Sequence, residues 1–239
     1  MVTALDIYNK LIHEDNILSV EGIISFELAQ VSITVKQKDV VGNIIQEWLA
    51  GWLRAHNIPF RVGDNSQMPP DFYLSEKSDE HLLEVKAFNR LASPAFDIAD
   101  FRMYQQEIIE KPYMLHVDYL IFGYEMTDDG RVIIRDLWLK KVWEITRRMK
   151  DWPLNLQIKQ GRVQKIRPSV WYSKQQREFL SFKTIEDFIS AVEQTVHQNP
   201  ETRMLSGTWL IDFQRAYQEQ YKIKLKIPRW NEIEESYIK

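Results

Sequence analysis

The sequence has 239 residues, of which 44% are hydrophobic and 12% aromatic, so it can form one large domain with its own core. Cysteine is absent, which excludes disulfide bonds, thiolate zinc sites and cysteine nucleophiles and leaves the chemistry to oxygen and nitrogen groups. The net charge of −3, taken over the whole chain, argues against a nucleic-acid partner. The apolar runs are too short to span a bilayer, so we expect a cytoplasmic protein without membrane contact.

The N-terminal part predicts a helix, a strand region and a second helix. Residues 3–18 indicate a short helix, and residues 22–34 indicate a strand or hairpin. An amphipathic helix that packs on a sheet is predicted over residues 40–56, before Pro59. Its apolar positions recur at helical spacing: Val41, Ile44, Ile45, Trp48, Leu49, Trp52 and Leu53.

The middle of the chain is rich in predicted strands. Residues 71–74 and 81–88 indicate neighbouring antiparallel strands, and residues 98–110 a helix. The runs HVDYLIFGYEM and RVIIRDLWLKK flank TDDG, whose Asp-Gly pair predicts a hairpin.

Two helices are predicted near the C-terminus, one from Thr184 to about residue 197 and one capped by Ser206 that runs to about residue 221. No repeat or long linker divides the sequence. We therefore expect a single domain over residues 1–239, of class α/β (α+β).

Charge is distributed unevenly along the chain. Residues 131–183 contain 14 Lys and Arg against 4 acidic residues, a net +10, with tryptophan and tyrosine residues interleaved. Such a surface suits the phosphate backbone of a nucleic acid. The alternative is an ordinary solvated surface.

Three charged residues form the most informative pattern. In a strand, Glu84 and Lys86 point to one face, and Asp71, after Pro70 on the adjacent strand, can come beside Glu84. Two neighbouring carboxylates repel each other, and a divalent cation relieves the repulsion; oxygen ligands favour Mg²⁺, which takes the rest of its shell from water and substrate phosphate. Lys86 can then hold the attacking water, stabilise negative charge or act as a base, which fits metal-assisted phosphodiester hydrolysis.

Each of these residues also has a structural interpretation. Asp71 could be a turn residue, and Glu84 with Lys86 an exposed ion pair. The large apolar side chains of Leu82 and Phe88 on the same face favour the functional interpretation. Glu47, at the border of the apolar stripe of its helix, could reach the site or could be a solvated acid.

The chain resembles a known nuclease superfamily. Its Pro70-Asp71 pair and the triplet EVK at residues 84–86 match the PD-(D/E)XK motif. The order EGIISFE, amphipathic helix, NSQMPPD, EVK, YLIFGY and basic hairpin resembles type II restriction endonucleases of the EcoRV kind. Residues 137–145 and 153–172 are similar to the NgoBV and NlaIV family, whose target is the interrupted palindrome GGNNCC.

This resemblance implies a restriction-endonuclease-like fold, in which helices flank a central mixed β-sheet, and a type II enzyme that cuts double-stranded DNA bluntly with Mg²⁺. It implies metal ligands at Asp71 and Glu84, a catalytic Lys86 and an accessory acid at Glu47. The family's minor-groove loop falls on Asn65, Ser66 and Gln67. Its major-groove loop, glycine-rich in the family but not here, falls on Ser173, Lys174, Gln175, Gln176 and Arg177.

A chain with one catalytic motif must cut two antiparallel strands, which predicts a homodimer on a palindrome. We expect residues 1–60 to serve dimerisation, residues 61–130 to form the catalytic core, residues 131–183 to recognise DNA and residues 184–239 to add helices. No organic cofactor is expected, since no Walker loop or dinucleotide glycine pattern occurs. The alternatives are a repair or recombination nuclease of the same superfamily, a non-catalytic DNA-binding module and an α/β scaffold.

Overall fold

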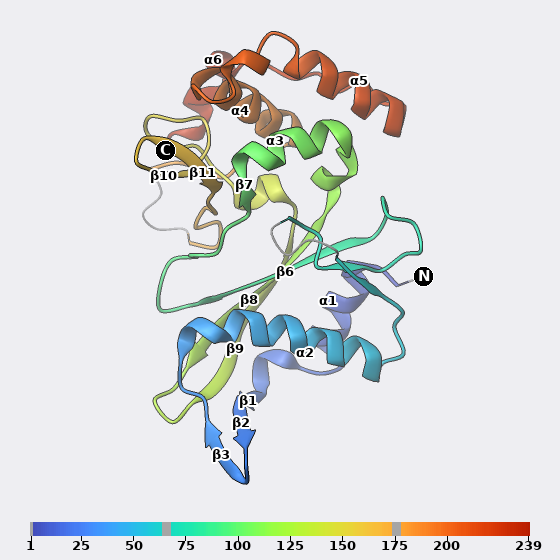
Figure 1. The fold of residues 1–239 in the computed structure, drawn as a ribbon, viewed down its shortest axis with the longest axis vertical. Coiled ribbons are helices and arrows are strands. Elements are labelled where there is room, and N and C mark those ends of the chain that lie inside the picture. The colour runs from blue at the N-terminus through green and yellow to red at the C-terminus, as the bar shows by residue number, and fades with distance from the viewer. Residues whose placement is uncertain (1, 64–67, 174–177) are drawn as a thin grey trace. The chain divides into compact units, whose positions relative to one another are not determined.

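The computed structural model describes residues 2–63, 68–173 and 178–239 (Figure 1). Its internal contacts divide the chain into two compact units. The first comprises Met1–Gly63, Pro70–Phe96 and Asp118–Lys140, and the second comprises the remainder. The division of the chain into one domain with four functional regions stays a prediction.

A six-stranded mixed sheet with the strand order β1-β9-β8-β6-β5-β4 forms the centre of the first unit. Strands β6 and β8 are parallel and the other neighbours antiparallel, which confirms the predicted mixed sheet and the antiparallel pair of β5 and β6. The strands are β1 Glu21–Ile23, β4 Arg61–Val62, β5 Phe72–Tyr73, β6 Leu82–Asn89, β8 Asp118–Met126 and β9 Arg131–Lys140.

Two helices, α1 Ala4–His13 and α2 Val41–Ala55, pack on the sheet through one shared hydrophobic core. Leu83 and Val85, alternate residues of β6, belong to this core, as the strand period requires. Helix α2 matches its prediction within a residue at each end. The prediction for α1 was too long, because the chain turns at Asn16 (φ 50°) into the 3₁₀ turn Ile17–Ser19.

Two hairpins belong to the same unit. The predicted Asp-Gly turn joins β8 to β9, with Gly130 at φ +92°, a conformation that favours glycine. The region predicted as a strand or hairpin forms β1 and then a separate two-stranded sheet of β2 Ser25–Leu28 and β3 Val31–Thr34.

Within its described residues, the second unit combines a three-stranded sheet, with the order β10-β11-β7, and the α-helices α3 to α6. Its strands are β7 Ala99–Asp100, β10 Leu156–Lys159 and β11 Arg162–Ile166, and its helices are α3 Phe101–Glu110, α4 Ile185–Gln198, α5 Trp209–Tyr221 and α6 Trp230–Ile233. Thr184 caps α4 by accepting a hydrogen bond from the Asp187 N–H at 3.1 Å, as predicted.

Two helix starts in this unit were predicted wrongly. Helix α3 begins at Phe101 and not at Ile98, because Ala99–Asp100 pairs with β11 and the Asp100 side chain caps the helix. Ser206 does not cap α5, which begins at Trp209; its hydroxyl instead donates to the Arg203 carbonyl at 2.7 Å.

Further 3₁₀ turns are Lys38–Val40, Pro112–His116, Val142–Ile145, Arg203–Leu205 and Glu234–Tyr237. In the part of the chain that the structure describes, no helix is both long and apolar enough to cross a membrane.

Candidate active site

Strand β6 places Glu84 and Lys86 on the same face of the central sheet, as the sequence pattern predicts. The ammonium Nζ of Lys86 lies 2.6 Å from Oε1 of Glu84. Glu84 is only 4% exposed, and Lys86 is half-buried. This pair is therefore not the exposed ion pair of the structural interpretation. Burying its charges costs free energy, a cost that an ion pair on the surface does not carry.

Asp71 lies beside this pair, immediately before β5. Its Oδ2 accepts a hydrogen bond from the backbone N–H of Val85 at 2.8 Å, which ties the carboxylate to β6 between Glu84 and Lys86. The backbone carbonyl of Asp71 accepts a hydrogen bond from the Gly63 N–H, also at 2.8 Å. The structure therefore brings the three motif residues together through backbone contacts on both sides of β5.

Burial perturbs the pKa of both carboxyl groups in the site. Burial is the largest cause that raises the pKa of Glu84, to about 7; Lys86 opposes the rise and Asp71 adds to it. Burial also raises the pKa of Asp71 above its usual value, against the effects of the Val85 N–H and of Lys86. Two acids with one nearby ammonium thus resist joint ionisation in the metal-free protein.

One oxygen of this site has no partner within the described chain. Oε2 of Glu84 is fully buried and accepts no hydrogen bond there. Burying a carboxylate oxygen without a hydrogen-bond donor costs free energy, and a bound cation would offset that cost. No group of three or more His, Cys, Asp or Glu side chains arranged for a metal occurs among the described residues, so Asp71 and Glu84 would leave further positions on an ion to water or substrate oxygens.

Helix α2 contributes Gln46 to the site, a residue that the sequence interpretation missed. The Gln46 Nε2 donates to Oδ1 of Asp71 at 2.7 Å. Glu47, the predicted accessory acid, is exposed on the same helix, and its role stays a prediction. The helical spacing could have revealed Gln46. Ala50 and Leu53, four and seven residues further on and thus on the same side of α2, are buried, whereas the corresponding positions for Glu47 are exposed.

Beyond Lys86, the strand continues into an aromatic cluster. The rings of Phe88 and Trp138 are stacked with centroids 5.8 Å apart, and the Arg90 guanidinium lies 5.4 Å from the Trp138 centroid. Arg90 also forms an ion pair with Asp136. A Cβ at Gly123 would lie 2.4 Å from Cδ of Arg90, so the absence of a side chain there admits the cluster. These contacts hold the end of β6 against β8 and β9.

Most of the predicted DNA-reading residues lie outside the described residues. They are Asn65, Ser66, Gln67, Lys174, Gln175, Gln176 and Arg177. Ser173 is described: it is half-buried, and its N–H donates to the Val170 carbonyl at 3.3 Å. The DNA-binding roles of all eight residues stay predictions.

The basic segment at residues 131–183 makes ion pairs with acids that lie outside it. In the first unit Arg131 contacts Glu21 and Arg135 contacts Glu125, both at 2.9 Å. The pairs in the second unit are Arg148–Glu234 at 3.3 Å, Arg162–Glu201 at 3.6 Å, Lys165–Asp100 at 3.8 Å and Arg167–Asp97. The local positive charge is therefore smaller than the count along the sequence suggests.

Comparison with known proteins finds relatives along almost the whole chain. A sequence model of the family described as NgoBV restriction endonuclease matches residues 1–237. The type II restriction enzyme NlaIV of Neisseria lactamica is 59% identical over 239 residues, which cover 100% of this chain and 98% of the relative. The type II restriction enzyme NgoBV of Neisseria gonorrhoeae is 56% identical over 161 residues, which cover 67% of this chain and 91% of the relative.

A solved structure shows the same fold. The NlaIV restriction endonuclease superposes with a TM-score of 0.97 at 58% identity, over 99% of this chain and 97% of the other. The predicted restriction-endonuclease-like fold is thereby confirmed.

Proposed function

This chain belongs to the NgoBV restriction endonuclease family and is therefore a sequence-specific restriction endonuclease, and we propose that it hydrolyses DNA with Mg²⁺ at Asp71, Glu84 and Lys86. The observation that carries the proposal is the carboxyl pair of buried Glu84 and half-buried Asp71, with Lys86 Nζ 2.6 Å from Glu84 and Oε2 of Glu84 without a donor in the described chain. Metal-assisted phosphodiester hydrolysis needs these groups.

Asp71 and Glu84 would hold the cation. Gln46 and the Val85 N–H each donate to one oxygen of Asp71, which fixes the plane of its carboxylate before any ion binds. A Mg²⁺ ion held by Asp71 and Glu84 would supply Lewis-acid chemistry, which polarises a phosphate oxygen and lowers the pKa of a bound water.

Lys86 supplies positive charge beside the carboxylates. Its side chain is 21% exposed, so the ammonium is anchored by Glu84 but still reaches the surface of the site. From this position it stabilises the negative charge that develops on the phosphate during attack, in a surrounding of lower dielectric than water.

We extend the proposal to the substrate and the assembly. One cluster per chain and two strands to cut require two copies, so the enzyme acts as a homodimer on a palindrome of double-stranded DNA in the bacterial cytoplasm. The likeness of residues 137–145 and 153–172 to the NgoBV and NlaIV family supports GGNNCC as the target and the EcoRV-like order of elements supports blunt cutting.

Digestion of phage DNA with the purified protein and Mg²⁺ tests this function. We expect discrete fragments whose sequenced ends are blunt and centred on GGNNCC, and no cleavage in EDTA. Asp71→Asn should reduce cleavage more than 100-fold while metal-free affinity for DNA stays equal or rises, because the lost carboxylate repelled phosphate. Staggered ends, an asymmetric site, or Asp71→Asn activity within tenfold of the parent would contradict the corresponding part of the proposal.

A further inference from the structure

The hairpin of β2 and β3 exposes a completely apolar face. Phe26 pairs with Ile33 and Leu28 with Val31, so these four side chains share one face of the two-stranded sheet. Each is 53–67% exposed. The opposite face is polar and consists of Ser25, Glu27, Ser32 and Thr34. Side chains of this size and number on a protruding element mark an interaction surface.

Little within the hairpin itself favours its formation. Its two-residue turn places Ala29 at φ 47° and Gln30 at φ 67°, the left-handed region in which residues with a Cβ are disfavoured. Glycine or asparagine usually occupies such positions. A two-stranded sheet alone is at best marginally stable in water, so burial of its apolar face against a partner would stabilise it.

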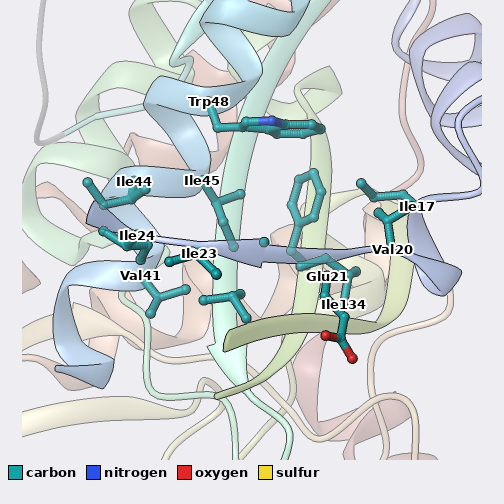
Figure 2. A pocket seen from close by; sticks show the side chains of 13 residues that line it. Ile17, Val20, Glu21, Ile23, Ile24, Val41, Ile44, Ile45, Trp48 and Ile134 are labelled. Carbon is teal, nitrogen blue, oxygen red and sulfur yellow. The ribbon is translucent and has the colours of Figure 1, made fainter. Parts of the chain in front are cut away.

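An apolar pocket lies at the base of this hairpin. Figure 2 shows Trp48 and Ile45 of α2 over the pocket, with Ile17 and Val20 on one side. The pocket has a volume of about 710 Å³, the open solvent at its mouth included. Several of the lining side chains remain 40–64% exposed, namely Val20, Ile23, Ile44 and Trp48.

The hairpin face and the pocket are both lined mainly by apolar side chains and belong to the same unit. One is a protruding apolar ridge, and the other is an apolar hollow that begins where Ile23 and Ile24 lead into β2. A small ligand in the pocket would leave the hairpin face in water. A second copy of the chain can cover both surfaces at once, because in a two-fold dimer each hairpin meets the other copy's pocket.

We propose that the β2–β3 hairpin is a dimerisation arm whose apolar face packs into the pocket of a second copy. The inference rests on the proposed homodimer and identifies the surfaces that form it. Stable interfaces bury roughly 800 Å² per partner. The hairpin face and the pocket rim offer eight large apolar side chains that are each 40–67% exposed and can be buried in such an interface. The polar face of the hairpin, with Glu27, then remains toward water.

Disulfide crosslinking tests the arrangement directly, because the chain has no cysteine of its own. Leu28→Cys protein is mixed with a tagged Ile44→Cys protein, both of full length, and oxidised; the tag separates mixed from identical pairs by size. We expect the mixed Leu28–Ile44 crosslink as the main product. Ser32→Cys, on the polar face of the same hairpin, serves as the matched control and should give at least tenfold less mixed product.

Sedimentation equilibrium provides the second measurement. Phe26→Ser with Ile33→Ser should weaken the dimer at least 100-fold while circular dichroism shows an unchanged fold, and Ser25→Asn with Ser32→Asn should not weaken it. A wild-type dimer without the mixed crosslink, and unaffected by the serine variants, overturns this inference and leaves the homodimer standing. A wild-type monomer, also with cognate DNA present, overturns both.

Discussion

Gln46 and Glu47 are neighbours in sequence but differ in what the fold does with them. The α-helix rotates about 100° per residue, so one side chain contacts Asp71 at 2.7 Å while the next is exposed. In the proposed mechanism Gln46 acts through Asp71 and is a positioning residue. An acid at that place would add a third negative charge to a buried pair, whereas the amide donates a hydrogen bond and adds none.

Substitution of Gln46 separates these roles. Gln46→Leu should lower kcat about 10- to 100-fold and raise the Mg²⁺ concentration needed for half-maximal rate, because an orienting partner of a metal ligand is lost. Glu47→Gln, one residue further on α2, is the matched control and should change kcat less. Titration of initial cleavage rates with Mg²⁺ measures both. A larger loss in the Glu47 variant would show that the exposed acid enters the site when DNA binds.

His116 illustrates a residue whose protonation opposes folding. Burial, with a smaller contribution from Lys141, lowers the pKa of His116 to about 4. Its Nε2 shares a hydrogen bond of 3.0 Å with the Tyr217 hydroxyl, and its ring packs against Tyr221. Between pH 4 and the usual value near 6.5 the unfolded chain binds a proton here that the folded chain does not, so stability falls as the pH drops through this range.

His116→Gln removes this titration. We expect the wild-type protein to lose Tm more steeply than the variant as the pH falls from 6.5 to 4, and the two curves to run parallel above pH 7. Thermal unfolding followed by circular dichroism at intervals of half a pH unit measures the difference. Parallel curves over the whole range would mean that His116 accepts its proton equally well in both states.

At the scale of elements, the short strands β4 and β5 hold Asp71 in place. The Gly63 N–H donates to the Asp71 carbonyl directly after β4, and a Cβ built on Gly63 would lie only 2.0 Å from the Pro70 carbonyl oxygen. The Pro70 carbonyl belongs to the backbone and cannot move aside as the end of a flexible side chain could. The close approach of the two chain segments next to Asp71 therefore depends on glycine.

Gly63→Ala should displace the backbone at Asp71, with a loss of about 1–3 kcal/mol of stability from overpacking and a fall in kcat of tenfold or more. Gly51→Ala is the matched control, because a Cβ on this exposed residue of α2 meets nothing within 4 Å. It should raise stability by up to about 1 kcal/mol and leave cleavage intact. Urea unfolding and cleavage rates of both variants check this, and equal rates in the two would contradict the role of Gly63.

At the scale of the whole molecule, ion pairs reshape the charge pattern. Residues 131–183 carry a net +10 in sequence, yet at least six of their basic side chains contact acids from elsewhere in the chain. A paired cation releases fewer counterions from DNA than an unpaired one. The salt dependence of DNA binding should thus reflect fewer charges than the sequence contains.

We expect the logarithm of DNA affinity to fall with the logarithm of salt concentration at a slope nearer about −4 than about −9 per protomer. Fluorescence anisotropy with the Asp71→Asn variant, free of divalent metal, measures it. Asp97→Asn, which removes one acidic partner of Arg167, should steepen the slope; Asp212→Asn, beside Arg215 outside the segment, should change it less. A wild-type slope near −9 would mean that DNA displaces the acids.

The parts of this protein that follow from local rules were predictable from the sequence. The two-residue period of a strand puts Glu84 and Lys86 on one face, the Asp-Gly turn makes the hairpin of β8 and β9, and helical spacing gives α2. The motif spacing and the resemblance it carries led to the superfamily and to Asp71. The predicted helix starts at Ile98 and Ser206 were wrong. Residues 99–100 pair with β11 before α3 begins, and a 3₁₀ turn precedes α5.

Other features exist only once distant segments meet. The hydrogen bond from Gln46 to Asp71 joins residues 25 positions apart, the acids that pair with the basic segment come from both ends of the chain, and the apolar pocket combines α2 with β8, β9 and the residues around β1. Sequence periodicity reports which face of an element is apolar but not which side chain of another element lies against it. That choice belongs to packing, in which desolvation and close contact act between residues that no local pattern relates.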